Sequence, residues 1–459
     1  MSGHLWAGAR GPGAGPRAGE ANIVGSVVDT DTSTDTTRAI EAVWRMESAK
    51  VIAALTRMVR DIGLAEELAQ DALVAALEQW PEAGVPKNPG AWLMAIAKRR
   101  AIDGFRRRDN RDRKYAEVGR TQAQDDAARD EFADVLERAD DAFIPDDLLR
   151  LVFTSCHPVL STEARVALTL RLLGGLSTDE IARAFLVAES TVAQRIVRAK
   201  KTLADKKIPF EVPRGDDRAA RLGSVLEVIY LVFNEGYSAT AGEDWMRPAL
   251  CAEAMRLGRV LAELAPDEPE VHGLVALMEI QASRTKARTS PTGEPVLLLD
   301  QDRSRWDWLL IRRGLAALER ATTLGGGNGP YVLQAEIAAC HGRARRAEDT
   351  DWARIADIYQ TLAALTGSPV VELNRAVALS MAYGPRMALS LVEELAEDKA
   401  LRGYHLLPTV HADLLAKLGR FEEATERFTA AAGLTRNARE RELLLARAAS
   451  TARGEPPDR

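Results

Sequence analysis

Apolar residues recur at helical spacing along most of the chain. Val51, Leu55, Met58 and Ile62 fall three or four positions apart, which places them on one face of a helix. The same periodicity returns after residue 148 and then continues from residue 215 to residue 455. The pattern therefore predicts an all-α protein.

Breaks in this periodicity divide the chain into five segments. Residues 1–37 are rich in small and polar side chains, which predicts a disordered leader. Residues 38–112 form a first helical module, and residues 113–147 read as an acidic linker because they hold many Asp and Glu and few large apolar groups. A second helical module spans residues 148–207. Two prolines separate it from a helical extension over residues 215–455.

The second module contains the strongest local signal, a helix-turn-helix between residues 176 and 203. Ser177 followed by Glu180 is the pattern of a capping box, and it precedes a short amphipathic helix that buries Ile181. We expect a second helix to open at Ser190. Its apolar positions, spaced four, three and four residues apart, are Val192, Ile196, Ala199 and Leu203. The remaining polar face suits a DNA major groove, although a helix pair with a solvated basic face has the same pattern.

The end of the first module is strongly basic. Residues 98–114 hold nine Lys and Arg among three Asp, enough for phosphate contacts with a salt-dependent affinity. A loop rich in Pro and Gly, residues 81–91, precedes this run, and an amphipathic segment with an acidic edge, residues 61–80, precedes the loop. A solvated helix end that continues into a linker is the alternative interpretation of the run.

These segments, in this order, resemble the sigma-70 superfamily, and specifically its extracytoplasmic-function group, which keeps only regions two and four. Residues 61–71 are similar to the region-two helix that binds the polymerase clamp, and residues 91–108 resemble the promoter-opening helix. Residues 175–200 are like region four, which reads the upstream promoter element. The resemblance covers residues 38 to 207. It implies two small helical sigma modules and an alternative sigma factor that binds core RNA polymerase and directs initiation at specific promoter DNA.

The resemblance also implies roles for three groups of residues. The polymerase-binding group is Glu67, Gln70 and Asp71. The group expected on the downstream promoter element is Lys87, Asn88, Arg99, Arg100, Arg106, Arg107 and Arg108. The group expected on the upstream element is Glu189, Ser190, Thr191, Ala193, Gln194, Arg195, Arg198 and Lys201, with Lys200 as a further phosphate contact. No catalytic residue is implied.

The extension follows another pattern. The spacing of Gly419, Phe421, Ala424, Phe428 and Ala431 resembles the second half of a tetratricopeptide (TPR) repeat, which predicts a TPR-like helical solenoid. Upstream, a polar helix end is expected to stop at a capping Gly236. Because the two sigma modules suffice for promoter recognition, we hypothesise that the extension regulates them, directly or through an unidentified partner.

The composition and the motifs also bear on disulfides, metal binding, membrane insertion and enzyme activity. The three cysteines lie far apart, which predicts neither a disulfide framework nor a metal site and favours the cytoplasm. Although Cys156 and Cys340 each precede a His, adjacent side chains diverge on a helix, so no metal or cofactor is predicted. No apolar run approaches the roughly 20 residues of a membrane span, and no phosphate-binding loop or other enzyme motif is present.

Two other protein classes account for part of these patterns. A one-component transcriptional regulator, with a DNA-binding head and a helical sensory domain, accounts for the helix-turn-helix and the extension but leaves residues 38–110 unexplained. A TPR scaffold without a DNA role leaves the basic run unexplained. Co-purification of core polymerase distinguishes a sigma factor from both.

Overall fold

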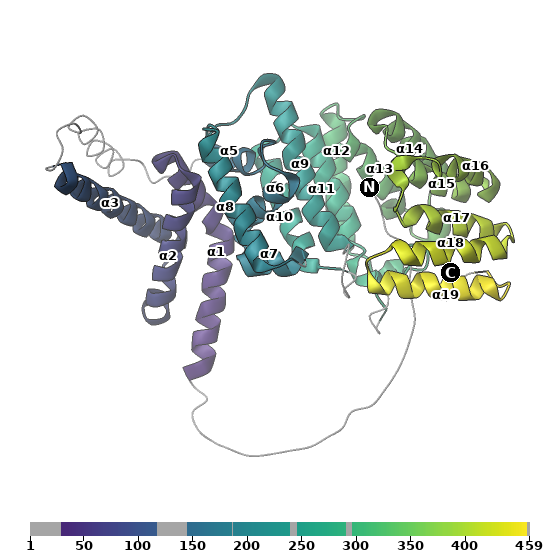
Figure 1. The fold of residues 1–459 in the computed structure, drawn as a ribbon, viewed down its shortest axis with the longest axis horizontal. Helices are drawn as coiled ribbons and strands as arrows, with labels where there is room; N and C mark the ends of the chain where they lie inside the picture. The colour runs from purple at the N-terminus through teal and green to yellow at the C-terminus, as the bar shows by residue number, and fades with distance from the viewer. Residues whose placement is uncertain (1–28, 117–144, 186, 239–245, 291–295, 457–459) are drawn as a thin grey trace, which may run out of the picture. The chain divides into compact units, whose positions relative to one another are not determined.

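The computed structural model describes residues 29–116, 145–185, 187–238, 246–290 and 296–456, and the side chains of residues 29–38 and 107–116 lie outside this description. The regular elements of these residues are α-helices and short 3₁₀ turns (Figure 1), which confirms the all-α prediction. The chain divides into two compact units, residues 16–228 and residues 229–459. Each unit has its own architecture.

Three helices form the first module of the first unit: α1 (Asp29–Val59), α2 (Ile62–Ala83) and α3 (Pro89–Ala116). Asp61 starts α2, because its side-chain oxygen accepts the backbone N–H groups of Gly63 and Leu64 at 2.7 and 3.0 Å. At the other end of α2, Trp80 is buried and meets the ring of Trp92 edge-on, with 5.2 Å between ring centroids. This pair holds α3 against α2 where the chain turns.

The structure differs from the sequence expectations at two boundaries of this module. Helix α1 begins at Asp29, inside the segment expected to be disordered. The expected loop beginning at Pro81 is also shorter than predicted, because α2 continues through this proline to Ala83. The burial of Trp80 in that last turn offsets the hydrogen bond that the proline removes. Of the expected acidic linker, residues 113–116 end α3 and residues 145–147 begin α5, while the rest lies outside the described residues.

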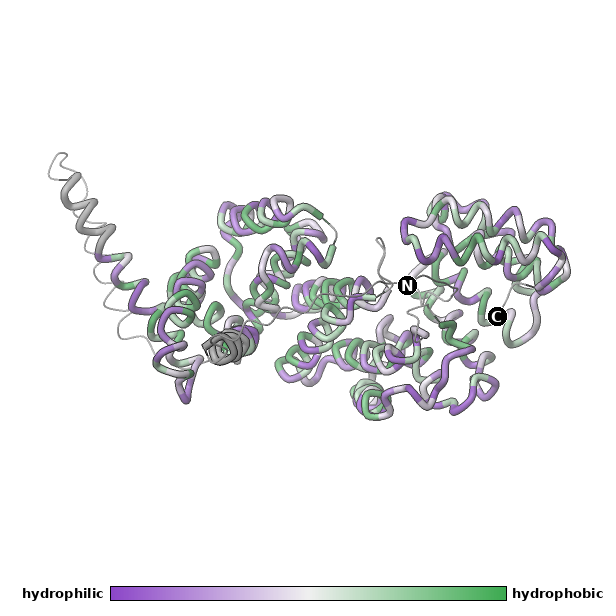
Figure 2. The backbone as a smooth tube through the Cα atoms, turned by 90° about the horizontal axis from the view of Figure 1, so that it is seen from below, coloured by the Kyte–Doolittle hydropathy of each residue, from purple (hydrophilic) through white to green (hydrophobic). Residues whose placement is uncertain are grey.

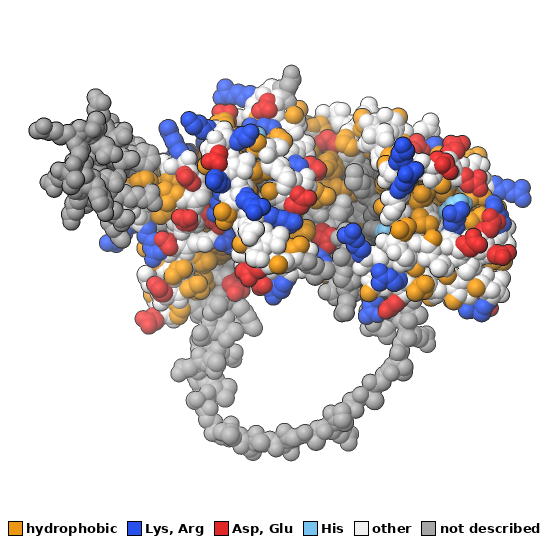
Figure 3. Space-filling view, viewed as in Figure 1, with side chains coloured by type: hydrophobic (Ala, Val, Ile, Leu, Met, Phe, Trp, Pro, Cys, Tyr) orange, Lys and Arg blue, Asp and Glu red, His pale blue; other side chains and the backbone are white. Residues whose placement is uncertain are grey.

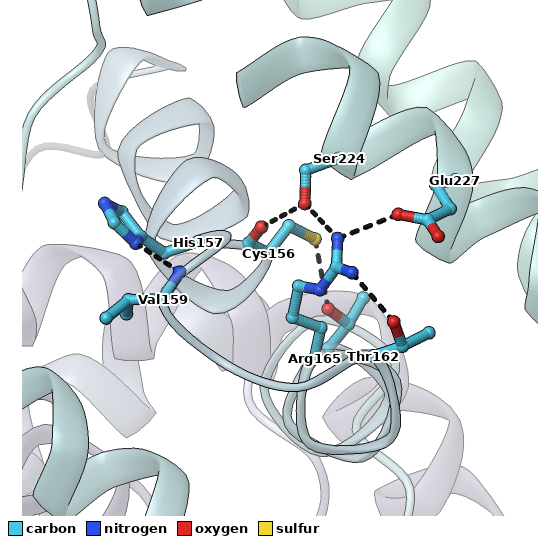
Figure 4. Close-up of polar contacts among 8 residues, drawn as sticks. Cys156, His157, Val159, Thr162, Arg165, Ser224 and Glu227 are labelled. Atoms are coloured by element: carbon cyan, nitrogen blue, oxygen red, sulfur yellow. Dashed lines mark hydrogen bonds and ion pairs between the residues drawn. The ribbon is translucent and has the colours of Figure 1, made fainter. Parts of the chain in front are cut away.

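The second module comprises α5 (Pro145–Ser155), α6 (Thr162–Leu172), α7 (Thr178–Phe185) and α8 (Glu189–Asp205). Helix α9 (Gly215–Tyr237) adds its first part to the same unit. Arg165 of α6 donates to Thr162 at 2.9 Å and reaches Ser224 and Glu227 of α9, the latter at 2.9 Å (Figure 4). Ser224 in turn donates to the Cys156 carbonyl at 2.6 Å. The beginning of α9 is therefore part of the structure that supports the second module.

The second unit is a succession of helices in which each contacts its neighbours along the chain, and α11 also contacts α13. Its helices after α9 are α10 (Pro248–Leu264), α11 (Pro269–Ala282), α12 (Trp308–Thr323), α13 (Pro330–Arg343), α14 (Trp352–Thr366), α15 (Pro369–Tyr383), α16 (Pro385–Leu395), α17 (Leu406–Lys417), α18 (Phe421–Leu434) and α19 (Ala438–Ala452). Five of them begin with Pro, where its missing N–H costs nothing. Hydrophobic and hydrophilic stretches alternate along the helices (Figure 2).

Packing in this unit relies on small residues. Ala424, Phe428 and Ala431 are completely buried, as the TPR-like spacing predicts. The expectation that Gly236 caps a helix is wrong, because α9 continues through it to Tyr237. A Cβ atom on Gly236 would lie 2.6 Å from the Cys251 backbone nitrogen, so this glycine serves the close approach of α9 and α10 instead.

We predict opposite effects for two Gly-to-Ala substitutions in helices of this unit. A Cβ atom on Gly273 would lie 2.8 Å from the Val332 backbone nitrogen, so Gly273→Ala should lower the free energy of unfolding by about 1–3 kcal/mol through overpacking. At exposed Gly433 nothing lies within 4 Å of the added atom, so Gly433→Ala should raise the free energy of unfolding by about 0.5–1 kcal/mol. Urea unfolding of both variants measures this, and equal shifts would contradict the close approach of α11 and α13.

Candidate nucleic-acid interface

Helices α7 and α8 form the helix-turn-helix, and its first helix begins at a capping box. The Ser177 backbone N–H donates to the Glu180 carboxylate at 2.8 Å, and the Glu180 backbone N–H donates to the Ser177 hydroxyl at 3.1 Å. Two backbone donors at the start of α7 are thereby satisfied. Ile181 and Ala182 are buried beneath them. The predicted capping box is confirmed, and so is the buried face at Ile181 and Ala182, whereas Phe185, which was expected to complete it, is only partly buried.

Helix α8 buries the apolar face that its spacing predicts. Val192, Ile196, Ala199 and Leu203 are all buried, and they pack against α6 and α7. The helix begins at Glu189 after an N-cap residue, Ala188, that makes no side-chain cap. The expectation that Ser190 opens the helix is therefore wrong by one residue. The opposite face of α8 is left facing away from the core.

Most of the upstream-element group lies on this opposite face. The exposed members are Glu189, Ser190, Gln194, Arg198 and Lys201, and the partly buried ones are Thr191, Ala193 and Arg195. Val197, which lies between them, is 64% exposed. A helix that presents hydroxyl, amide and guanidinium groups on one outer face has the chemistry to contact base edges and phosphates together.

The residues expected to bind polymerase lie near the start of α2. Glu67 is exposed, and Asp71 is exposed with an ion pair at 3.2 Å to Arg100 of α3. Gln70 is partly buried and donates to the Glu66 carboxylate at 2.6 Å. The exposed acidic edge of α2 is therefore made by Glu67 and Asp71, while Gln70 faces a buried carboxylate.

Glu66 makes ion pairs from the first module to two helices of the second. Its side chain is only 4% exposed, yet it meets Arg171 of α6 at 2.6 Å and Lys200 of α8. Arg171 also donates to the Leu176 carbonyl at 3.1 Å. Lys200, expected to contact phosphate, instead neutralises Glu66 in this arrangement. Sequence reasoning missed the contact because the partners lie more than a hundred residues from Glu66 and no local pattern marks it.

Two further ion pairs join the modules. Arg57 of α1 meets Asp147 of α5 at 2.7 Å, and Asp147 is fully buried and also accepts from Arg150 at 2.7 Å. Arg45 of α1 meets Glu180 of the capping box at 2.9 Å. Region two and region four of the expected architecture are thus packed against each other, with Lys200 of α8 paired with Glu66 of α2.

The residues expected to contact the downstream element differ in their surroundings, and the structure does not describe the side chains of all of them. Lys87, Arg99 and Arg106 are exposed. Asn88 is exposed as well, but its side-chain oxygen accepts the Ala91 N–H at 3.1 Å and caps α3. The side chains of Arg107 and Arg108 lie outside the described residues. On the face drawn in Figure 3, Lys and Arg are interspersed with Asp and Glu.

The adjacent Cys and His residues have structural partners. Burial raises the pKa of the Cys156 thiol, whose sulfur lies 3.2 Å from the Thr169 hydroxyl. Burial, and then the charge of Arg221, lowers the pKa of His157, which accepts the Val159 N–H at 3.1 Å (Figure 4). Within the described ranges, no cluster of three or more His, Cys, Asp or Glu could hold a metal ion. None of the helices described there is both long and apolar enough to cross a membrane.

Comparison with known families assigns three parts of the chain. The family described as Sigma-70 region 2 matches residues 44–111, and the family described as Sigma-70, region 4 matches residues 150–203. Residues 221–322 match a family of unknown function (DUF6596). The first two matches cover the modules that Glu66 joins, and the third begins within α9 and covers the first part of the extension.

Comparison with curated proteins gives a similar division. An uncharacterized protein of Rhizobium meliloti is 45% identical over 391 residues, which is 85% of this chain and 90% of that protein. The probable ECF RNA polymerase sigma factor SigI of Mycobacterium tuberculosis is 28% identical over 39% of this chain and 59% of its own length. The ECF RNA polymerase sigma factor SigK of a Mycobacterium strain is 29% identical over 34% of this chain and 77% of its own. No solved structure matches the chain.

We predict that Glu66→Gln loosens the contact between the modules. The amide keeps the shape of the side chain but leaves Arg171 and Lys200 without the charge that they share, which should lower the free energy of unfolding of this unit by about 1–3 kcal/mol. Urea unfolding and amide hydrogen exchange in α6 and α8 measure the effect. The neighbouring Glu67→Gln is the control, since Glu67 makes no ion pair among the described residues. If both variants behave alike, Glu66 does not hold the modules together.

Proposed function

The chain belongs to the sigma-70 superfamily, as an extracytoplasmic-function RNA polymerase sigma factor with a helical C-terminal extension, and from this membership we propose how it initiates transcription. We propose that it binds core RNA polymerase through the acidic edge of α2. Helix α3 and the loop before it then contact the downstream promoter element, and α8 reads the upstream element. This places its action in the cytoplasm, with polymerase and promoter DNA.

The outer face of α8 carries the proposal. Its buried positions fix the helix on α6 and α7, so that Gln194 and Arg198 are presented together on the exposed side. An amide can make paired hydrogen bonds to adenine in the major groove, and a guanidinium suits guanine or phosphate. The region-two match argues against a one-component regulator, which has no use for residues 44–111.

The contact at Glu66 implies a step before promoter binding. Lys200 and Arg171 share the Glu66 carboxylate at the start of α2, next to the acidic edge proposed to meet polymerase. A region four that must reach its own promoter element has to leave this position. We therefore propose that polymerase binding at α2 competes with the Glu66 contact and releases α8 toward DNA.

Run-off transcription tests this function and the role of α8. The full chain with purified core polymerase should start transcripts at the promoter upstream of its own gene. Gln194→Ala should change the preference at one upstream base pair by about 1–3 kcal/mol. Arg198→Ala should weaken binding on all sequences alike and reduce the salt slope by about 1. Failure of the full chain to bind core polymerase would refute the function, and equal effects of the two variants would refute the assigned roles.

We further propose that the extension regulates the sigma modules. The modules that read promoters end with the first unit at Val228, yet half of the chain follows. A truncation after Val228 tests the extension more specifically than one at Pro213, because it retains Ser224 and Glu227, the partners of Arg165.

Truncation after Val228 should change the transcript yield severalfold at an unchanged promoter. Run-off transcription and polymerase affinity, measured side by side with the full chain, give the result. The same measurements on the Pro213 truncation show how much of any loss comes from removing the α9 contacts. Unchanged yield, promoter choice and affinity in the Val228 truncation would exclude regulation by the extension.

A further inference from the structure

A cavity of about 180 Å³ lies within the helical extension. Its walls come from α11, α13, α14, α15 and α17, together with the segment between α11 and α12. It is smaller than the roughly 300–1,000 Å³ of sites for drug-sized ligands. A nucleotide is therefore too large for it, whereas a compact organic molecule is not.

Two arginines from the segment after α11 line this cavity. Arg284 and Arg288 are 8% and 3% exposed. Both guanidinium groups face the ring of Tyr237, at 5.8 and 3.6 Å from its centroid. Burial, together with the neighbouring charge of Arg284, lowers the pKa of Arg288. Two cations are thus held side by side away from water, an arrangement that opposes folding unless something offsets it.

No carboxylate among the described residues matches the charge of Arg284. Its guanidinium donates to the neutral Gln281 side chain at 2.6 Å. Its Nε atom has no hydrogen-bond partner, and no carboxylate of the described residues forms an ion pair with Arg284. Asp413, the acidic residue in the cavity lining, already meets Arg447 at 2.7 Å. The cavity therefore holds excess positive charge.

The other polar groups of the lining are neutral. Burial, and then the charges of Arg284 and Arg303, lowers the pKa of His341 to about 3, so its ring carries no charge at neutral pH. The His341 Nδ1 atom is buried without a hydrogen-bond partner among the described residues. Gln301 donates to the Val296 carbonyl at 3.1 Å and leaves its own side-chain oxygen unpaired. Unused polar atoms in a lined cavity indicate a ligand that would complete them.

The rest of the lining is apolar and aromatic. Trp352 meets His341 edge-on, with 5.1 Å between ring centroids, and Tyr359 lies one helical turn beyond Ile355 in the same helix. Leu277 and Ile337 face the cavity from α11 and α13. Such walls suit a flat or branched hydrocarbon body and give little to a fully hydrated inorganic ion.

We propose that this cavity binds a small organic anion, with its carboxylate or phosphate group on Arg284 and Arg288 and its hydrocarbon body against Trp352 and Tyr359. The guanidinium groups supply the donors that match such an anion in pairs. The anion neutralises the buried charge, and the aromatic walls exclude water around it. The site does not depend on whether the extension regulates transcription.

Thermal unfolding and titration calorimetry of the full chain test the site. The probes are benzoate and phenyl phosphate at millimolar concentration, with acetate and inorganic phosphate as anions that lack the hydrocarbon body. Benzamide is the uncharged match for benzoate, and ionic strength is kept constant with chloride. Benzoate or phenyl phosphate should raise the Tm and release or absorb heat with a saturable isotherm. Benzamide should do neither, and the two organic probes show which anionic group the site prefers.

Arg284→Gln should abolish this response without harming the empty protein. The amide removes a buried charge beside Arg288, so the Tm without anion should stay equal or rise, while the affinity for the organic anion falls about tenfold or more. Arg312→Gln is the control, because Arg312 is exposed on α12 and outside the cavity lining. It should leave the affinity within about twofold.

Three results would overturn the proposal. The first is that neither organic anion binds the full chain at millimolar concentration. The second is that benzamide binds as well as benzoate, which would show an apolar pocket without selection for charge. The third is that Arg284→Gln lowers the Tm of the empty protein and leaves anion binding unchanged, which would make Arg284 a structural residue.

Discussion

The buried carboxylate of Glu66 in the first sigma module is compensated by two cations of the second. Removing a carboxylate from water costs several kcal/mol unless opposite charges compensate for it, and here Arg171 and Lys200 supply them from the other module. If either cation moved away, the buried Glu66 carboxylate would lose part of the charge that compensates for its removal from water. The packing of α1 against α5 and α6 and the ion pair of Arg57 with the buried Asp147 hold the same two modules together.

In this arrangement the two modules are packed against each other. Under the proposed function, they would have to separate when the protein binds polymerase and DNA. Lys200 lies on the same helix as Gln194 and Arg198, so the α8 that should approach DNA phosphates is oriented by an acidic group of its own chain. Any partner that takes the start of α2 competes for the same surface. Under the proposed function, polymerase bound at α2 would have to replace these charges before α8 could reach DNA.

Local patterns predicted well where one face of a helix decides the packing. The spacing of Val192, Ile196 and Ala199 gave the buried face of α8 because each lies on the same stripe, and the capping box at Ser177 formed because its partners are three residues apart. Burial of Glu66 was not predictable in this way, because its partners come from another module. Gly236 was misread because the same residue type serves both helix ends and close helix approach, and only the position of Cys251 distinguishes them.

The cavity of the extension differs from other described parts of the molecule in how its buried charge is compensated. Elsewhere buried ions meet opposite ones: Glu279 is paired with Arg259 and Arg313, and Arg447 with Asp413. Arg303 also lies deep in the extension, but the carbonyl groups of His341 and Ala344 accept its protons at 2.9 and 2.7 Å. Arg284 receives neither kind of compensation from the described residues. A buried guanidinium without compensation destabilises the helices around it, so Arg284 is the group in this cavity that a bound anion would stabilise most.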